Sequence, residues 1–362
     1  MRSRQVSLVL GGGGIRGLAH VGVLAALEDH HLVPAEVIGS SVGALVGAAW
    51  CAGAATDELR LLAHQIQRDD LFRIAHGDMA LRRLRAPAIY RREPLADFVR
   101  GLLGDATFDD LARPLLVNTV DINTGAQVFW GSPGLRDVRV ADAVIASCTM
   151  PGFLPPHRIG DRYFVDGAAA ANLPVHPASR PDRDLVIAVD VSARARQDRA
   201  VQRLGFAAGF ARGIELGIQR MDDVALRAWT RPPLLLVRPA VWHVELLSFR
   251  HNSELVEAGL RATHAVLDAP NAIPGPDAVG VYPRRRVRVE VLRDRCVGCG
   301  ACVSAGPPGQ FRLDDEGKAV ATDPTPVWSP VDGYCVTQCP TSAIAVLELE
   351  PRIEAPLPHP PA

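Results

Sequence analysis

The chain lacks several features that would place it in particular classes of protein. Its 362 residues carry a formal net charge of −1, so the basic excess typical of nucleic-acid-binding proteins is missing. The apolar run after the basic N-terminus, Val6 to Leu10, leads into glycines and is too short for a signal peptide. The most apolar later stretch, Val42 to Ala55, is shorter than the roughly 20 residues that span a bilayer. We therefore expect a cytoplasmic protein without a nucleic-acid partner.

Lysine is the scarcest charged residue. Lys318 is the only one, a bias that we attribute to genome composition rather than to function. The apolar fraction of 48% is ample for a packed core and excludes a disordered chain. The length suits two domains, one large and one small. In a cytoplasmic protein, the seven cysteines are expected to be reduced thiols or metal ligands rather than disulfides.

Short apolar segments alternate with helical patterns through most of the chain. The expected strands are residues 6–10, 37–38, 114–121, 126–130, 162–165, 185–191 and 234–237. The expected helices are residues 17–29, a very apolar one through Trp50, 201–229 and 253–267. We interpret the helix at 201–229 as packed on the sheet rather than as a lid. The alternation predicts an α/β fold over residues 1–267, with a mainly parallel sheet and helices on both faces.

The composition changes after residue 267. Residues 268–286 are rich in proline and glycine and are expected to form a linker. Valines alternate with charged residues at 287–291, as in a half-buried strand, and residues 344–349 are its expected partner. We therefore expect a small C-terminal α+β domain at 287–349. Residues 350–362 are rich in proline and are predicted to be disordered.

A glycine-rich loop follows the first expected strand. Its pattern, Gly12-x-Gly14-x-x-Gly17, can indicate dinucleotide binding when it lies between a strand and a helix. That interpretation also requires an acidic residue at the end of the second strand. Here the second strand ends in Gly39-Ser40-Ser41-Val42-Gly43 instead, so we reject nucleotide binding.

The pattern Gly39-x-Ser41-x-Gly43 is typical of a nucleophile elbow. A serine at a sharp strand-to-helix turn adopts a strained backbone conformation, and flanking glycines relieve the crowding. Its hydroxyl then lies at the N-terminus of a helix, where developing negative charge is favoured. The neighbouring first strand also ends in a glycine turn, so the N–H groups of Gly12, Gly13 and Gly14 are expected to point at an oxyanion. Arg16 would support that loop or meet an anionic substrate.

A serine nucleophile needs a base. Asp166 ends an expected strand and precedes Gly167, so we expect its carboxylate to be exposed at an edge of the sheet. An Asp-Gly pair is also common in ordinary turns. None of the eleven histidines has a comparable position at a strand end.

These motifs together resemble the patatin-like phospholipase family. The resemblance covers roughly residues 5 to 270 and rests on blocks that occur in the family's order. The blocks are Gly12 to Gly17, Gly39 to Gly43, Ala146 to Gly152, Asp166 to Ala168 and Asn172 to Val175.

The resemblance implies a catalytic Ser–Asp dyad and an acyl-enzyme. Ser41 would be the nucleophile and Asp166 the proton acceptor. Gly12, Gly13, Gly14 and Arg16 would form the oxyanion hole. The remaining motif glycines are Gly17, Gly39, Gly43 and Gly167. The family's substrates imply an acyl-ester lipid such as a phospholipid, with peripheral contact at the inner membrane face.

Cysteines near the C-terminus have the spacing of an iron–sulfur site. Cys296, Cys299 and Cys302 fit one face of a [4Fe–4S] cube, and Cys339, followed by proline, supplies the fourth thiolate. Zinc is the main alternative, but zinc sites usually use two separate pairs of cysteines. We therefore expect one [4Fe–4S] cluster.

The small domain, residues 287–349, resembles a bacterial ferredoxin. A two-cluster ferredoxin would have another cysteine at position 306, where this chain has Gly306, so a single cluster is predicted. Cys335 is then left over, as a buried thiol rather than as a replacement ligand. Cys51 and Cys148 are expected to be small buried residues.

Two classes of function follow from these motifs. The first is a lipid acyl hydrolase whose small domain serves redox coupling with a partner protein, sensing or stability. The alternative is an iron–sulfur electron-transfer protein that uses its larger half as a lipid-binding scaffold. The intact serine, aspartate and glycine loop favour the hydrolase, because a scaffold does not need all three.

Overall fold

The computed structural model describes residues 4–74, 88–192, 205–269, 273–275 and 277–349. The chain divides into two compact units, Met1–Gly280 and Val281–Ala362. The division falls inside the proline- and glycine-rich stretch at 268–286. The tail at 350–362, which we predict to be disordered, lies outside the described residues.

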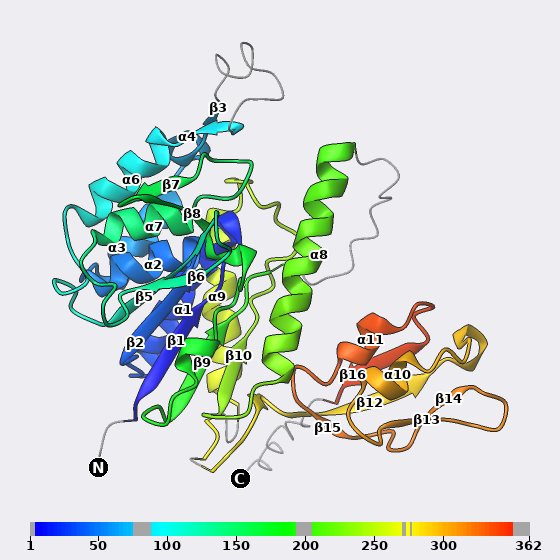
Figure 1. The fold of residues 1–362 in the computed structure, drawn as a ribbon. Helices are drawn as coiled ribbons and strands as arrows, with labels where there is room; N and C mark the ends of the chain where they lie inside the picture. The colour runs from blue at the N-terminus through cyan, green and yellow to red at the C-terminus, as the bar shows by residue number, and fades with distance from the viewer. Residues whose placement is uncertain (1–3, 75–87, 193–204, 270–272, 276, 350–362) are drawn as a thin grey trace, which may run out of the picture. The chain divides into compact units, whose positions relative to one another are not determined.

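The first unit is built on a mostly parallel sheet (Figure 1). Within this unit the strands run in the order β10-β9-β1-β2-β5-β8-β7, with β6 also pairing with β5. The strands are β1 (Val6–Leu10), β2 (Glu36–Ser40), β5 (Leu115–Asp121), β6 (Gln127–Trp130), β7 (His157–Ile159), β8 (Arg162–Asp166), β9 (Leu185–Val189) and β10 (Leu234–Val237). Those from β10 to β5 are parallel, whereas β6, β7 and β8 pair antiparallel. The central strands are buried along their whole length, which explains their continuous apolar sequences.

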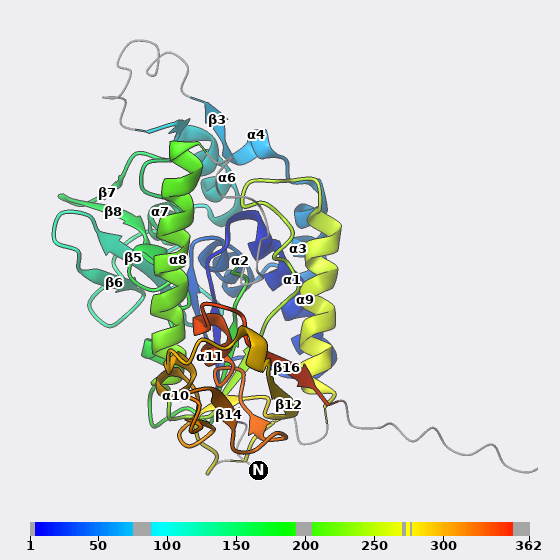
Figure 2. The same ribbon diagram turned by 90° about the vertical axis from the view of Figure 1, so that its right-hand side faces the viewer.

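Helices cover both faces of this sheet. Figure 2 shows α9 beside α1 and α3, with α8 on the other side of α2. The helices are α1 (Ala19–Asp29), α2 (Val42–Cys51), α3 (Thr56–Gln65), α4 (Arg68–Leu71), α6 (Glu93–Leu103), α7 (Val140–Ser147), α8 (Phe206–Arg227) and α9 (Asn252–Leu267). Short 3-10 turns are η1 (Gly14–Leu18), η3 (Gly167–Ala169) and η4 (His176–Ala178), and β3 (Arg73–Ile74) pairs with β4 (Tyr90–Arg91). The described part of the chain contains no helix that is long and apolar enough to cross a membrane.

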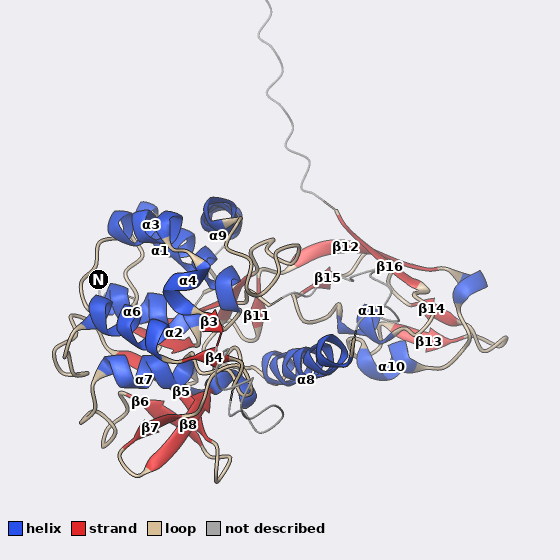
Figure 3. Cartoon of the chain, turned by 90° about the horizontal axis from the view of Figure 1, so that it is seen from above, coloured by secondary structure: helices blue, strands red, loops and turns tan. Residues whose placement is uncertain are grey.

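The second unit is small and has its own core. Figure 3 shows α10 and α11 beside its short strands. Its elements are β11 (Val281–Tyr282), β12 (Arg285–Val291), η6 (Arg293–Arg295), α10 (Ala301–Ala305), β13 (Phe311–Leu313), β14 (Ala319–Ala321), β15 (Val327–Trp328), α11 (Tyr334–Gln338) and β16 (Ile344–Glu348). β12 pairs antiparallel with β16, from Val287 opposite Glu348 to Val291 opposite Ile344, which confirms the predicted strand pair.

Candidate active site

The glycine loop and the elbow serine lie side by side. β1 and β2 are neighbouring parallel strands in which Leu10 pairs with Gly39, so the two turns that follow meet at one edge of the sheet. The contact is close at Gly12, where a Cβ atom would lie 3.2 Å from the Cβ of Ser41. Side chains larger than glycine would therefore separate the loop from the serine.

Ser41 has the strained backbone expected of a nucleophile elbow. Its φ of 53° and ψ of −128° are unusual for a residue with a side chain, and such conformations cost on the order of 1–3 kcal/mol. A Cβ on Gly43 would lie 2.3 Å from the carbonyl oxygen of Leu10, and one on Gly39 would lie 2.5 Å from the Cα of Ala44. Both glycines are thus required by close packing of the turn. Ser41 is the N-cap of α2 and is itself buried.

Asp166 lies next to Ser41, but in a different environment from the predicted one. We expected its carboxylate to be exposed at a sheet edge; instead it is 3% exposed. Asp166 pairs with Thr119 of β5, and its N–H donates to the Thr149 carbonyl oxygen at 2.8 Å. Burial raises the pKa of Asp166 to about 6, although hydrogen bonds from the Ala168 N–H and the Ser41 hydroxyl lower it. The Ala168 N–H donates to Asp166 Oδ1 at 2.9 Å.

The glycine loop supplies fewer oxyanion donors than predicted. The N–H of Gly12 donates to the carbonyl oxygen of Asn172 at 3.0 Å, so this group is not free for an oxyanion, contrary to our expectation. In the described part of the chain, the N–H groups of Gly13 and Gly14 meet no acceptor. Gly14 has a φ of 55°, and a Cβ there would lie 2.5 Å from the Leu246 carbonyl oxygen.

Arg16 is held behind the loop by α8. Its side chain is buried, and its Nη2 lies 3.7 Å from Oε1 of Glu215. Burial lowers the pKa of Arg16, which the charge of Glu215 partly offsets. This ion pair fits the loop-supporting role that the sequence offered as one of two alternatives. The motif glycine Gly17 packs against α2, where a Cβ would lie 2.7 Å from Cγ1 of Val42.

Two buried polar residues that we did not predict as functional hold the elbow and the aspartate loop together. The Ser147 hydroxyl accepts the Ser41 N–H at 2.9 Å and donates to the Asn118 carbonyl oxygen at 2.7 Å. The Asn118 amide donates to the Ala171 carbonyl oxygen at 2.8 Å, and a Cβ on Gly167 would lie 2.4 Å from that amide. Ser147 falls within one of the motif blocks, whereas nothing local in the sequence marks Asn118.

A buried histidine also fixes the glycine loop. His20 Nε2 donates to the Gly11 carbonyl oxygen at 2.8 Å. Burial lowers the pKa of His20 to about 4, so the imidazole is neutral at pH 7 and positions the loop without adding charge. No local pattern in the sequence singles it out among the eleven histidines.

An apolar pocket opens beside Ser41. Its walls come mainly from α2, α3 and α6, with Leu45, Leu59 and Leu95 as representative lining residues. Cys148 also lines the pocket. Burial of this thiol, and to a lesser extent the nearby charge of Asp166, raise its pKa well above the usual value. The candidate nucleophile Ser41 therefore lies in the wall of an apolar pocket that suits a hydrocarbon chain.

The four cysteines that we predict as cluster ligands all lie in the second unit, at different depths. Cys296 and Cys302 are buried in its core and Cys339 packs against that core, whereas Cys299 is exposed. Backbone N–H groups point at two of the sulfurs: Ala319 donates to Cys296 Sγ at 3.3 Å, and Ala343 donates to Cys339 Sγ at 3.1 Å. Such N–H···S contacts suit thiolates that hold a metal cluster.

Cys335 belongs to the same core and has no exposed surface. It is completely buried in α11, and its Sγ contacts the Asp332 carbonyl oxygen at 3.5 Å. Burial raises the pKa of Cys335 to about 11, a value that favours the protonated thiol.

Gly298 and Gly300, with φ of 71° and 72°, allow the loop between the first cysteines to curl.

The geometry of the first unit defines a class of enzyme site. A strained serine at a strand-to-helix turn lies beside a buried carboxylate, and two backbone N–H groups nearby meet no acceptor among the described residues. This is the arrangement of a serine hydrolase. Residues 8–179 match the family model of patatin-like phospholipase. Residues 8–179 are therefore similar to the patatin-like phospholipase domain, in agreement with the resemblance noted from the motifs.

Two curated proteins and one solved structure are similar to parts of this chain. An uncharacterized NTE family protein of Mycobacterium tuberculosis is 33% identical over 52% of this chain and 50% of its own length. A cGAMP-activated phospholipase of Escherichia coli is 27% identical over 46% of this chain and 52% of its own. The chain thus spans about half the length of these curated relatives. The crystal structure of VipD from Legionella pneumophila covers 74% of this chain and 67% of its own, at 13% identity and a TM-score of 0.40.

Proposed function

We propose that this protein is a lipid acyl hydrolase of the phospholipase or lysophospholipase type. The observation that carries the proposal is that Ser41 and Asp166 are buried together, with the Ser41 hydroxyl lowering the pKa of the carboxyl, beside an apolar pocket. The pair supplies a nucleophile and its base, and the pocket suits the acyl chain of an ester substrate. To reach lipid substrates, the protein would bind peripherally to the surface of a membrane or lipid aggregate.

In the first half-reaction, Ser41 Oγ attacks the carbonyl carbon of the ester. Its proton passes to Asp166, whose pKa of about 6 leaves it mostly ionised at neutral pH. The carbonyl oxygen becomes an oxyanion, which the N–H groups of Gly13 and Gly14 and the N-terminus of α2 stabilise. Collapse breaks the ester C–O bond, and Asp166 returns the proton to the leaving alcohol.

In the second half-reaction, water hydrolyses the acyl-enzyme. Asp166 takes a proton from the water, whose oxygen attacks the acyl carbon and forms a second oxyanion. The bond to Ser41 Oγ then breaks, the proton returns to the serine, and the fatty acid leaves. Neither half-reaction requires a histidine.

The test is hydrolysis of a panel of phospholipids and short acyl esters. We expect Ser41→Ala and Asp166→Asn to lose turnover by at least about 10³-fold, since each removes a partner in every step. Ser253→Ala is the control, because Ser253 is an exposed serine in the same unit. Full esterase activity in Ser41→Ala would reject the mechanism. Reversible reduction without any serine-dependent hydrolysis would instead favour the electron-transfer alternative.

We also propose that Cys296, Cys299, Cys302 and Cys339 hold one [4Fe–4S] cluster. The packing of Cys296, Cys302 and Cys339 in or against one small core, and the N–H···S contacts to two of these sulfurs, support it. When bound, the cluster would supply one-electron redox chemistry toward a partner protein, a sensing function, or a cross-link that stabilises the unit. Zinc is the alternative occupant of the four thiolates.

Metal analysis of anaerobically purified protein tests this proposal. We expect about four iron atoms and four sulfides per chain, and their loss in Cys302→Ala. Cys335→Ala is the matched control, because this buried cysteine in the same core is not a proposed ligand. One zinc ion and no sulfide would contradict the proposal, as would iron lost equally in both variants.

A further inference from the structure

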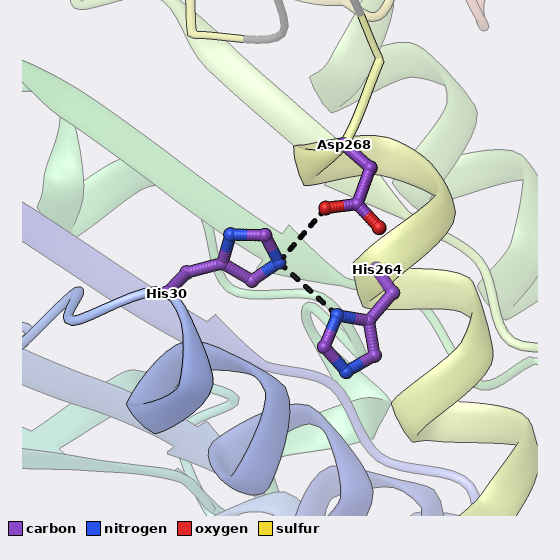
Figure 4. A group of neighbouring side chains, drawn as sticks. All are labelled: His30, His264 and Asp268. Carbon is purple, nitrogen blue, oxygen red and sulfur yellow. Dashed lines mark hydrogen bonds and ion pairs between the residues drawn. The ribbon is translucent and has the colours of Figure 1, made fainter.

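Two histidines and an aspartate meet where α1 and α9 end (Figure 4). His30 follows the last residue of α1, His264 lies in the last turn of α9, and Asp268 follows that helix. His30 and His264 are half-buried and Asp268 is exposed, and one ligand atom from each lies within 4.8 Å of the others. The motifs discussed above use none of these residues.

The donor atoms are spaced like ligands of a single metal ion. His30 Nε2 lies 3.1 Å from His264 Nδ1 and 3.4 Å from Asp268 Oδ1. With metal–ligand distances of about 2.0–2.1 Å, the edge of a coordination tetrahedron is about 3.3 Å. In a neutral imidazole, a single proton on His30 Nε2 cannot serve both neighbours well, whereas a cation between the three atoms would satisfy all of them.

A second carboxylate sets the orientation of His264. Asp29 Oδ2 lies 3.3 Å from His264 Nε2, on the side of the ring away from His30. When Nε2 carries the proton and donates it to Asp29, Nδ1 keeps its lone pair toward the other two donors. Metal-binding histidines usually donate their second ring N–H to a carboxylate in this way.

Close packing of the two helices makes the site rigid. A Cβ on Gly22 of α1 would lie 1.9 Å from the Val256 carbonyl oxygen, and one on Gly259 of α9 would lie 1.9 Å from the Ala19 carbonyl oxygen. The helices therefore touch along their backbones. Ligands at the ends of elements held in this way need little further ordering when an ion binds.

We propose that His30, His264 and Asp268 form a site for a divalent transition-metal ion, with Zn²⁺ the best fit. Two imidazoles and one carboxylate suit Zn²⁺ and disfavour Mg²⁺ or Ca²⁺, which prefer oxygen ligands. Water would occupy the fourth position on the exposed side. α1 has 11 residues and a length of about 16 Å, so this site is separate from the glycine loop at the other end of that helix. The ion would join α1 to α9.

The experiment must separate this site from the cysteines, which also bind metals. Titration of the full chain with Co²⁺ does so, because thiolate ligands give ligand-to-metal charge-transfer absorption and an imidazole–carboxylate site does not. We expect His264→Ala and Asp268→Asn to lose one equivalent of Co²⁺ and of Zn²⁺ without changing the thiolate absorption. Asp29→Asn should weaken binding about 10–100-fold.

His251→Ala is the matched control, because His251 is an exposed histidine of the same unit that contacts Glu254. It should bind metal as the unmodified protein does. Asp268 is exposed, so Asp268→Asn is expected to keep the fold, and circular dichroism checks this. Equal stoichiometry and affinity in the unmodified protein, Asp268→Asn and Asp29→Asn would overturn the proposal.

Discussion

Asp166 is a buried acid whose proposed function requires its charge. Its pKa is raised to about 6 by burial, so it is protonated and unable to accept the Ser41 proton below that value. We expect kcat/KM for ester hydrolysis to fall about tenfold per pH unit below pH 6 and to be nearly constant from pH 7 to 8. A pH profile between 4.5 and 8, with circular dichroism at each pH, measures this. A flat profile across pH 5 to 7 would contradict it.

The same shift predicts an effect on stability. Because the pKa is near 3.8 in the unfolded chain and about 6 in the fold, the folded state binds the proton more tightly. The favourable contribution is complete below pH 3.8 and is lost as the pH rises through 6. At pH 8 the buried charge thus costs roughly 3 kcal/mol, at 1.36 kcal/mol per unit.

Asp166→Asn should therefore raise the free energy of unfolding at pH 8 while abolishing hydrolysis. The gain should shrink as the pH falls toward 4, where the unmodified side chain is also neutral. Urea unfolding of both proteins at the two pH values measures the difference. A difference that does not change with pH would mean that the buried charge is not its cause.

Single residues of the site were predictable where the signal is local. The glycines at 39 and 43 and the serine between them occupy a turn whose geometry the spacing itself requires. The burial of Asp166 was not predictable, since its neighbours, such as Thr119 of β5 and the Thr149 carbonyl oxygen, are distant in the chain. The Asn172 carbonyl oxygen, which accepts the Gly12 N–H, is likewise distant from Gly12 in the sequence.

At the level of elements, the contact between α1 and α9 depends on two glycines. We expect Gly259→Ala to destabilise the protein by about 1–3 kcal/mol, because its Cβ would meet backbone atoms of α1 that no rotamer change can move. Gly101→Ala is the control: Gly101 is exposed in α6, no atom lies within 4 Å of its added Cβ, and the change should stabilise by about 0.5–1 kcal/mol. Chemical denaturation measures both, and similar effects at the two positions would refute the argument.

Elements were predictable in kind more than in their ends. Apolar periodicity predicts a helix at 17–29, whereas the structure has the 3-10 turn η1 first and α1 only from Ala19. The Ile15 N–H donates to the Leu246 carbonyl oxygen at 3.0 Å, a contact that holds the turn in place and is distant in sequence. The histidine pair at the ends of α1 and α9 escaped prediction for the same reason. The predicted helix at 201–229 is observed at Phe206–Arg227, and residues 201–204 lie outside the described part.

In the molecule as a whole, the two proposed functional sites lie in different units. The sheet of the first unit carries Ser41, Asp166 and the apolar pocket, so the proposed hydrolysis needs no residue of the second unit. The mainly parallel sheet was predicted from the alternation of strands and helices. The strands at 126–130 and 162–165 were also predicted, but not that β6 and β8 pair antiparallel with β5; Asp166 is the last residue of β8.

The core of the second unit predicts how the protein responds to loss of iron. Among the described residues of the unit, that core holds ten buried residues, and Cys296, Cys302 and Cys335 are three of them. A unit this small buries too little apolar surface to be very stable alone, so a cluster joining its thiolates would supply much of its stability. For a domain of this size each kcal/mol shifts Tm by about 4–8 °C.

We therefore expect calorimetry of the iron-loaded chain to show two unfolding transitions. Removal of iron should lower the Tm of the smaller one by at least about 10 °C, while the larger one and ester hydrolysis change little. Cys335→Ala, loaded with iron, is the control and should keep both transitions close to those of the unmodified protein. If the Tm of both transitions is the same with and without iron, the small core is stable without a cluster. A single transition that moves as a whole would mean that the cluster stabilises both units together, so hydrolysis by the first unit would then depend on iron in the second.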